Sequence, residues 1–310
     1  MNRVSTVGNY SAVLANIQAA QQRQMEAGNQ VASQKKGSDL KDFAKGAELL
    51  TAMRTVDARV TSYRDQNKLL VDRLTTQDLA LNQVTDAAAG TRQAIADALA
   101  SGRAETLMED LSGQFRNAVE GMNARHGGKY LFAGGKIDTM PVTATAMSDL
   151  TNPLTPNISD FFQNDDFQAQ TRVDDATTVK TGLLADDVGT DLMTAFKSLQ
   201  AFHEGASGPL TGELTAAQKT YLEGVLATWD SVRSDLTNET ARNGMVQSRV
   251  DAVQSDLGYR SDSLASMMGD ITDADMTEAA SALQQAQFAV QAAAQVFLTL
   301  KQTSLLNILQ

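Results

Sequence analysis

Few side chains in this sequence have the types or the spacing that chemistry requires. The 310 residues include no cysteine and two histidines, His126 and His203, which are far apart in the chain. The cysteine count excludes disulfides, thiolate nucleophiles and cysteine-based zinc sites, and two distant histidines do not suit a catalytic triad or a multi-histidine metal site. We predict that both histidines lie on the surface and that the protein has no catalytic residue, no metal and no cofactor.

Some glycines and carboxylates match ligand-binding motifs only in part. Gly127-Gly128-Lys129 lacks the four-residue spacing and the preceding strand of a phosphate-binding P-loop, so we exclude nucleotide binding. Carboxylates that are adjacent in the sequence do not face one another as a catalytic pair does, and we interpret three such pairs as solvated surface. These pairs are Asp165-Asp166, Asp174-Asp175 and Asp186-Asp187.

A second short motif could begin a calcium-binding loop. Asp273 and Asp275 have the alternating spacing of such a loop, but its sixth position holds Glu278 instead of glycine and its twelfth holds Gln284 instead of glutamate. We interpret the segment as a helix start, in which Thr272 and Asp275 form a capping box.

Composition favours long helices and excludes two classes of partner. The chain has 26 basic and 37 acidic side chains, a formal net charge of -11, which would repel nucleic acid and anionic lipid. Four prolines, 5% aromatic residues and 42% hydrophobic residues suit a helical core better than a β-sandwich. No window approaches the ~20 apolar residues of a membrane span, and the start of the chain lacks the apolar core of a secretory signal.

The strongest pattern is an alternating four-and-three spacing of apolar residues, which runs from Leu49 through Val56 to Ala98. We call such a line of apolar residues on one helix face a seam. At ~1.5 Å per residue the pattern predicts a helix roughly 75 Å long, and the spacing of 3.5 residues implies a left-handed supercoil against a partner helix.

A second seam runs from Leu222 to Ile271 and contains the single tryptophan, Trp229. The two long helices match in length, so we predict an antiparallel pair. Shorter helices are expected around Leu107–Met122 and Leu192–Phe202. The stretch 137–187, rich in Thr, Asp and turn formers, predicts a small β-rich insertion.

Both ends of the chain are apolar and helical, although chain ends are normally polar and frayed. The last helix has apolar residues on its seam and others beside it, such as Leu298, so it needs more neighbours than one amino-terminal partner helix supplies. We predict that the two ends pair and gain further cover from other copies; the alternative is a hairpin packed onto its own bundle. The residues assigned to assembly are Val7, Tyr10, Leu14, Ile17, Leu283, Val290, Phe297, Leu300, Leu305, Leu306, Ile308 and Leu309.

Several segments resemble the flagellin family, in particular its hook-filament junction branch. Val4–Thr6 and the connector Ala32–Ser38 resemble the family's opening and its "SGKR" step, and Asn123–Lys136 is similar to the "DGGRYLFGGTK" hairpin. Asp270–Asp275 resembles "IEDAD", and Ser304–Leu309 is similar to "SLLNYL". The hairpin motif comprises Gly127, Gly128, Tyr130, Leu131, Phe132, Gly134 and Gly135.

The matching segments cover both helical arms and leave the insertion unmatched. Within them, His126 replaces an expected Asp, Ala133 replaces a Gly, and the connector has Gln34-Lys35-Lys36 where a Gly is usual. The resemblance implies a terminal helical domain (1–45 and 270–310) on the inside of a tube. Outside it would lie a helical rod (46–136 and 188–269, with a hairpin near 127–136) and the exposed insertion (137–187).

The resemblance also implies a function and partners. It suggests a mainly α, non-enzymatic structural protein that self-assembles into a ring of the bacterial flagellum and connects the hook to the filament. The implied partners are other copies of the chain, the preceding hook-associated protein, flagellin or the filament cap, and an export chaperone. The protein would be extracellular, exported by the type III apparatus without cleavage of a signal peptide. Filament flagellin and a cytosolic coiled-coil adaptor are the alternative readings.

Overall fold

The computed structural model describes residues 3–43 and 46–306, with the side chains of residues 11–43 and 46–300. The chain is mainly helical with a small β insertion, as predicted. It divides into two compact units: unit 1 comprises Met1–Arg59 and Tyr259–Gln310, and unit 2 comprises Val60–Gly258. The stretch 137–187, predicted as a domain of its own, lies within unit 2.

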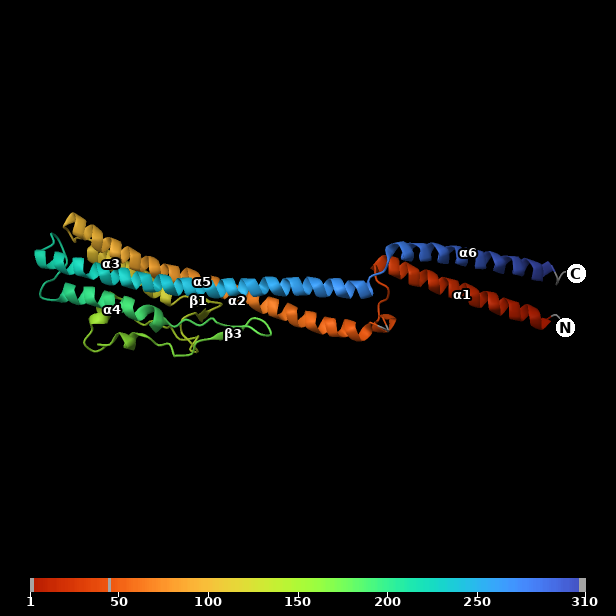
Figure 1. Cartoon of the computed structure of the whole chain (residues 1–310), viewed down its shortest axis with the longest axis horizontal. Helices are drawn as coiled ribbons and strands as arrows, with labels where there is room; N and C mark the ends of the chain where they lie inside the picture. The colour runs from red at the N-terminus through yellow and green to blue at the C-terminus, as the bar shows by residue number, and fades with distance from the viewer. Residues whose placement is uncertain (1–2, 44–45, 307–310) are drawn as a thin grey trace. The chain divides into compact units, whose positions relative to one another are not determined.

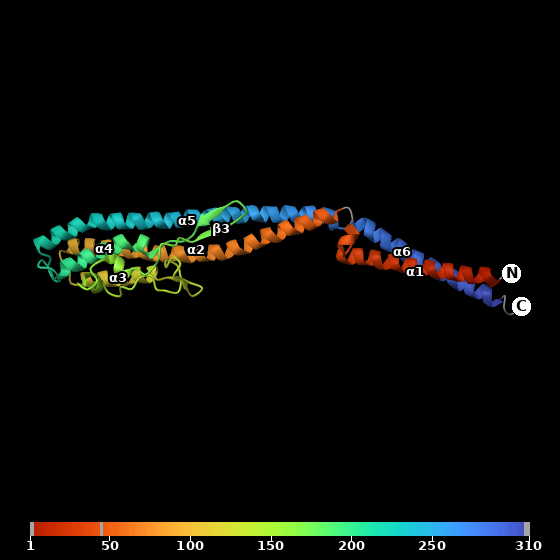
Figure 2. The same cartoon turned by 90° about the horizontal axis from the view of Figure 1, so that it is seen from below.

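Unit 1 is built around the pairing of the first and last helices. α1 (Arg3–Ser33) and α6 (Met276–Leu306) lie side by side in both Figure 1 and Figure 2. The beginning of α1 lies beside the end of α6, so the two helices are antiparallel. The short 3-10 helix η1 (Leu40–Phe43) and the adjoining ends of α2 (Ala47–Ser101) and α5 (Ala216–Thr272) complete the unit.

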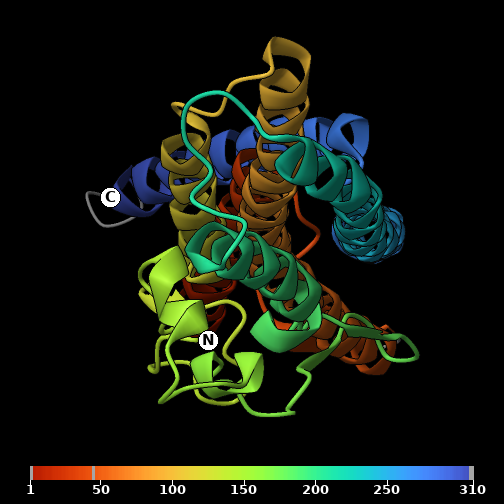
Figure 3. The same cartoon turned by 90° about the vertical axis from the view of Figure 1, so that its left-hand side faces the viewer.

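In unit 2, α2 and α5 are antiparallel, as predicted. Contacts between them run in opposite directions along the two helices: Arg92 Nε lies 2.6 Å from Asp230 Oδ1, and Gln254 Nε2 donates to the carbonyl of Arg64 at 3.3 Å. The helices α3 (Leu107–Met122) and α4 (Ala185–Glu204) pack against this pair, as the end-on view in Figure 3 shows.

Three aromatic rings from three helices meet at the centre of this core. The ring of Phe196 on α4 stands edge-on to Phe115 on α3 at 5.3 Å and to Trp229 on α5 at 4.8 Å. All three side chains are fully buried. Such edge-to-face pairs add to the free energy of burial, so this cluster fixes how the three helices meet.

The insertion contains little regular structure. It has two 3-10 turns, η2 (Met147–Thr151) and η3 (Ile158–Phe161), and one antiparallel hairpin of β3 (Gln170–Arg172) and β4 (Thr178–Lys180). The β3–β4 hairpin lies along α2 and α5 (Figure 2). It forms a second hydrophobic cluster with them, separate from the core around Trp229.

The seam of α2 differs from the prediction at its beginning. Leu50 is fully buried there, whereas the predicted seam residues Leu49 and Val56 are exposed. Further along, Val60, Leu74 and Leu81 are buried as predicted. The first turns of α2 belong to unit 1, whereas the part of the seam that follows the prediction lies in unit 2.

Candidate functional site: the terminal helix pair

The contact between α1 and α6 is lined by small residues. The buried side chains are Ala20 and Ala27 on α1 and Ala279 and Ala286 on α6. Because alanine and glycine allow close approach, the Cα atoms of the two helices come within 8 Å of one another.

The predicted assembly residues occupy two different environments in this pair. Ile17, Leu283, Val290, Phe297 and Leu300 are half-buried on the faces that α1 and α6 turn toward each other. Leu14 is instead largely exposed. The α6 seam thus follows the predicted spacing, whereas on α1 the covered line passes through Ile17 and Ala20 and leaves Leu14 beside it.

Six of the predicted residues cannot be placed by their side chains. The structure describes the backbone of Val7, Tyr10, Leu305 and Leu306 as helix but not their side chains, and Ile308 and Leu309 lie outside the described residues.

A second apolar surface lies on the side of α6 away from α1. Phe288 is nine residues from both Ala279 and Phe297, which is about two and a half helical turns, so it points away from the seam. It is 62% exposed, and Val296 and Leu298 are 50% and 52% exposed. At about 100° per residue, Val296 and Leu298 lie about 80° from Phe288, one on each side of it. We call this uncovered side of α6 its outer face, with Phe288 at its centre and Val296 and Leu298 at its two edges. α6 therefore exposes apolar side chains outside the face that α1 covers.

The sequence analysis recognised Leu298 but missed Phe288 and Val296. These two residues do not fall on the seam, and only the placement of α1 shows that half or more of each side chain stays exposed. Fully burying an aromatic or aliphatic side chain contributes about 1.5–3 kcal/mol. The outer face is therefore a strong candidate for contact with another molecule.

The connector after α1 is held against the joint between α5 and α6 by main-chain hydrogen bonds. Lys36 N donates to the carbonyl of Thr272 at 2.8 Å, and Ala274 N donates to the carbonyl of Gln34 at 2.9 Å. Gln34 has a φ of 59°, a left-handed conformation that is uncommon for a residue with a side chain. We call residues 34–36 and 270–274 the clasp.

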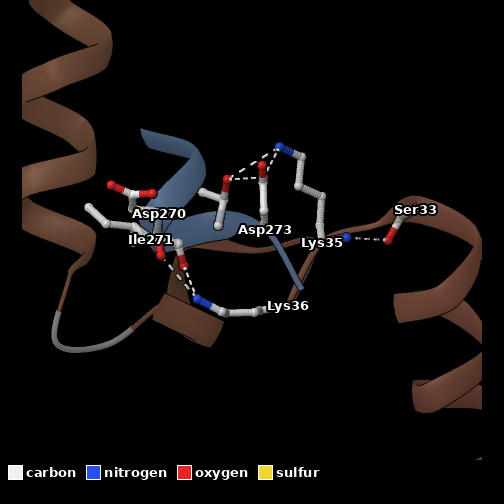
Figure 4. A network of polar contacts seen from close by, with 7 residues as sticks. Ser33, Lys35, Lys36, Asp270, Ile271 and Asp273 are labelled. Carbon is white, nitrogen blue, oxygen red and sulfur yellow. Dashed lines mark hydrogen bonds and ion pairs between the residues drawn. The ribbon is translucent and has the colours of Figure 1, made fainter. Parts of the chain in front are cut away.

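Two lysines complete the clasp, as Figure 4 shows. Lys35 Nζ lies 2.6 Å from Asp273 Oδ1, and this partner lowers the pKa of the Asp273 carboxyl. Lys36 Nζ donates to the carbonyls of Asp270 and Ile271 at 3.1 and 3.3 Å, so it satisfies carbonyls in the last turn of α5. The basic step that the sequence showed at Lys35-Lys36 thus joins the connector to the chain's last helical joint.

The capping box predicted at this joint does not form, although Asp275 does cap α6. Thr272 is the last residue of α5, and its hydroxyl contacts Asp273 and Lys35. Asp275 precedes α6, and its Oδ1 accepts from the amides of Thr277 at 2.8 Å and Glu278 at 3.2 Å, which lowers the pKa of this carboxyl. A side chain at position 272 is too early for α6, because the helix begins at Met276.

The glycine-rich hairpin motif forms a tight turn and a buried anchor in unit 2. β1 (Arg125–His126) pairs with β2 (Lys129–Tyr130), so one strand lies on each side of the Gly127-Gly128 turn. The hairpin was predicted near 127–136 and therefore begins two residues earlier than predicted. Both glycines have positive φ, as a two-residue hairpin turn requires. Tyr130, Leu131 and Phe132 are buried, and the amide of Gly135 donates to Asp165 Oδ1 at 2.7 Å.

The residues that could do chemistry have local structural partners. His126 Nδ1 lies 3.0 Å from Thr76 Oγ1, and His203 Nδ1 accepts from the amide of Leu210. Asp165 accepts amide hydrogen bonds, which lower its pKa, and burial raises the pKa of Asp187. Among the described residues, we find no cluster of three potential metal ligands and no helix that is long and apolar enough to cross a bilayer.

Comparison with known proteins shows that the chain is similar to flagellar proteins. Residues 226–309 match the family model for the bacterial flagellin C-terminal helical region. Two similar solved structures are a putative flagellar hook-associated protein from Vibrio parahaemolyticus and FlgL from Bacillus cereus, each with 14% sequence identity. The first has a TM-score of 0.59 and covers 75% of this chain and 100% of its own. The second has a TM-score of 0.53 and covers 71% and 99%. No curated protein sequence matches the chain.

The fold is therefore that of these flagellar helical proteins. The carboxyl-terminal region matches the flagellin family model, and the predicted resemblance to the flagellin family is confirmed. The match includes the whole of α6 up to residue 306, and with it the outer face of α6.

Proposed function

We propose that this protein is a non-enzymatic structural subunit of the bacterial flagellum that connects the hook to the flagellin filament. It self-assembles into a ring within the tube, with the preceding hook-associated protein on one side and flagellin or the filament cap on the other. It is exported through the type III apparatus, with a chaperone binding it beforehand, and acts outside the cell.

The observation that carries this proposal is the outer face of α6. A helix that exposes apolar residues outside the face its partner covers gains further burial from a second neighbour, and α1 is the first neighbour. The second neighbour is an adjacent subunit, so that packing of the terminal pair and assembly occur together.

Removal of the protein from a flagellated host cell tests the function. We expect hooks to persist, filaments to be absent and unpolymerised flagellin to appear in the medium, because filament growth then has no base. Cells that still carry filaments of normal length would show that the protein is not the junction.

Filament flagellin is the second candidate, favoured by the family match over residues 226–309. It predicts that the purified chain polymerises alone into long filaments, whereas a junction subunit forms at most short assemblies. A cytosolic adaptor predicts that the intact protein is found in the cytoplasm and never in sheared flagella.

A further inference from the structure

The two hydrophobic clusters of unit 2 meet at a layer of buried polar side chains. One cluster surrounds Trp229 and reaches Ala80 on α2; the other begins at Leu74 on α2 and includes the β3–β4 hairpin. Between them, Gln77 on α2 and Asn243 on α5 are 1% and 3% exposed. We call this pair the boundary layer.

The boundary layer is only partly satisfied by hydrogen bonds. Gln77 Nε2 donates to Asn243 Oδ1 at 3.0 Å, and Asn243 Nδ2 donates to the carbonyl of Leu74 at 3.2 Å. Gln77 Oε1 is buried and accepts no hydrogen bond from the described residues. Because a buried polar atom without a partner is unfavourable, apolar residues here would make the helix pair more stable.

Two further features weaken the packing at the same level. An open cavity of about 450 Å³ is lined by both residues of the boundary layer and by Thr181 and Gly182, which follow β4. Gly244 follows Asn243 within α5, and a side chain at this glycine would meet nothing within 4 Å. Glycine weakens a helix interior, and no crowding within the chain requires it there.

The β3–β4 hairpin contacts α2 and α5 on the side of the boundary layer away from Trp229. Asn67 Nδ2 donates to the carbonyl of Val173 at 2.9 Å, and Val173 and Val179 are buried against α2 and α5. Tyr63 OH donates to Asp175 at 3.3 Å. These contacts all belong to the second cluster and none reaches the core around Trp229.

We propose that the β3–β4 hairpin, with the α2 and α5 segments beneath it, opens as a cooperative unit separate from the core around Trp229, and that Gln77 and Asn243 form its boundary. Proteins open in contiguous units whose limits follow the continuity of apolar packing, and here the apolar packing is interrupted. The proposed unit thus contains the hairpin together with Val60, Leu70 and Val250, which belong to the same cluster.

Native-state hydrogen exchange on the full-length chain tests this inference. In the wild type, the amides of Val173 and Thr181, which donate to Thr177 and Ala169, should exchange well before the amide of Ala185, which donates to Phe132. The double substitution Gln77→Leu with Asn243→Leu makes the apolar packing continuous, so exchange at Val173 and Thr181 should slow about tenfold or more.

Thr91→Val is the matched control. Thr91 is a fully buried polar residue of α2 in the core around Trp229, and its hydroxyl donates to the carbonyl of Ala87 within the helix. The substitution removes a buried polar group that does not belong to the boundary layer, so the amides of Val173 and Thr181 should keep their wild-type exchange rates. If the double variant instead leaves the Val173 and Thr181 amides unchanged, the proposal is wrong.

If the double variant does not fold, a second variant tests whether the hairpin opens separately from the core around Trp229. Asn67→Ala removes the hydrogen bond to Val173, so the hairpin amides should exchange about tenfold faster while Ala185 keeps its wild-type rate. An equal acceleration at Ala185 would mean that the hairpin and the core open together, which contradicts the proposal.

Discussion

Lys35 and Asp273, 238 positions apart in the chain, face each other across an isolated antiparallel β-bridge, and their side chains form an ion pair of 2.6 Å. The main-chain hydrogen bonds on either side fix the connector after α1 to the residues just before α6. The clasp therefore joins the carboxyl-terminal end of α1 to the amino-terminal end of α6.

The clasp should respond to acid. The pKa of Asp273 is lowered in the folded protein, first by its hydrogen bond with Lys35, so ionised Asp273 stabilises the folded state above the pKa of an unfolded aspartate, about 3.9. This stabilisation is lost as the pH falls through the lower folded pKa. Hydrogen exchange at the Ala274 amide should therefore show a larger loss of protection between pH 5 and 2 in the wild type than in Asp273→Asn.

Asp270→Asn provides the control for this experiment. It lies in the clasp, but its main-chain carbonyl, not its carboxylate, accepts from Lys36. In this variant, the loss of hydrogen-exchange protection at the Ala274 amide on acidification should equal the loss in the wild type. If Asp273→Asn and the wild type lose protection equally, the ion pair does not contribute to the clasp.

The proposed assembly role of the outer face of α6 predicts that a substitution there reduces assembly without changing the stability of the monomer. Phe288→Ser removes an exposed apolar ring, so we expect the free energy of unfolding of the monomer to change by less than about 0.5 kcal/mol. Its incorporation into flagella should fall strongly, because the ring is expected to be buried by a neighbouring subunit. The measurement pairs urea denaturation of the purified chain with the amount of the protein in sheared flagella.

Leu154→Ser is a matched surface control. Leu154 is 89% exposed in unit 2, outside the terminal pair. Incorporation of this variant should equal that of the wild type. Equal incorporation of Phe288→Ser and Leu154→Ser would contradict an assembly role for the outer face.

The sequence predicted what depends on periodicity. The bounds expected for α3, Leu107–Met122, are those observed, and the seam of α6 passes through Ala279, Leu283 and Ala286 as the spacing requires. In both cases one line of apolar residues faces one partner, and the period of the α-helix identifies that line.

Features that depend on which neighbour is present were missed. Leu50 replaces Leu49 on the covered face of α2, and Phe288 is visible as a surface residue only once α1 is placed. The clasp needs a left-handed Gln34 and a pairing across most of the chain, for which a local pattern gives no signal. Thr272 was assigned to the wrong helix, because a helix boundary moved by a few residues changes which side chain caps it.

Alanine substitutions at two glycines with nearly equal φ distinguish the cost of backbone strain from the cost of steric crowding. Gly134 and Gly212 have φ of 66° and 64°. An added Cβ at Gly134 would lie 2.3 Å from Asp165 Oδ1 and 2.6 Å from its carbonyl oxygen, whereas nothing lies within 4 Å at Gly212. We expect Gly212→Ala to cost about 1–2 kcal/mol from strain and Gly134→Ala to cost more. Urea denaturation followed by circular dichroism measures both, and equal costs would contradict the crowding at Asp165.

The aromatic cluster makes a prediction about the stability of unit 2. Phe196 is fully buried between Phe115 and Trp229, so Phe196→Ala should lower the free energy of unfolding by about 3–5 kcal/mol. Trp229 is the single tryptophan, so its fluorescence during urea denaturation reports on this core. Phe167→Ala, which removes a ring that is 61% exposed, should cost less than about 0.5 kcal/mol. A loss below about 1 kcal/mol for Phe196→Ala would show that the three rings do not hold α3, α4 and α5 together.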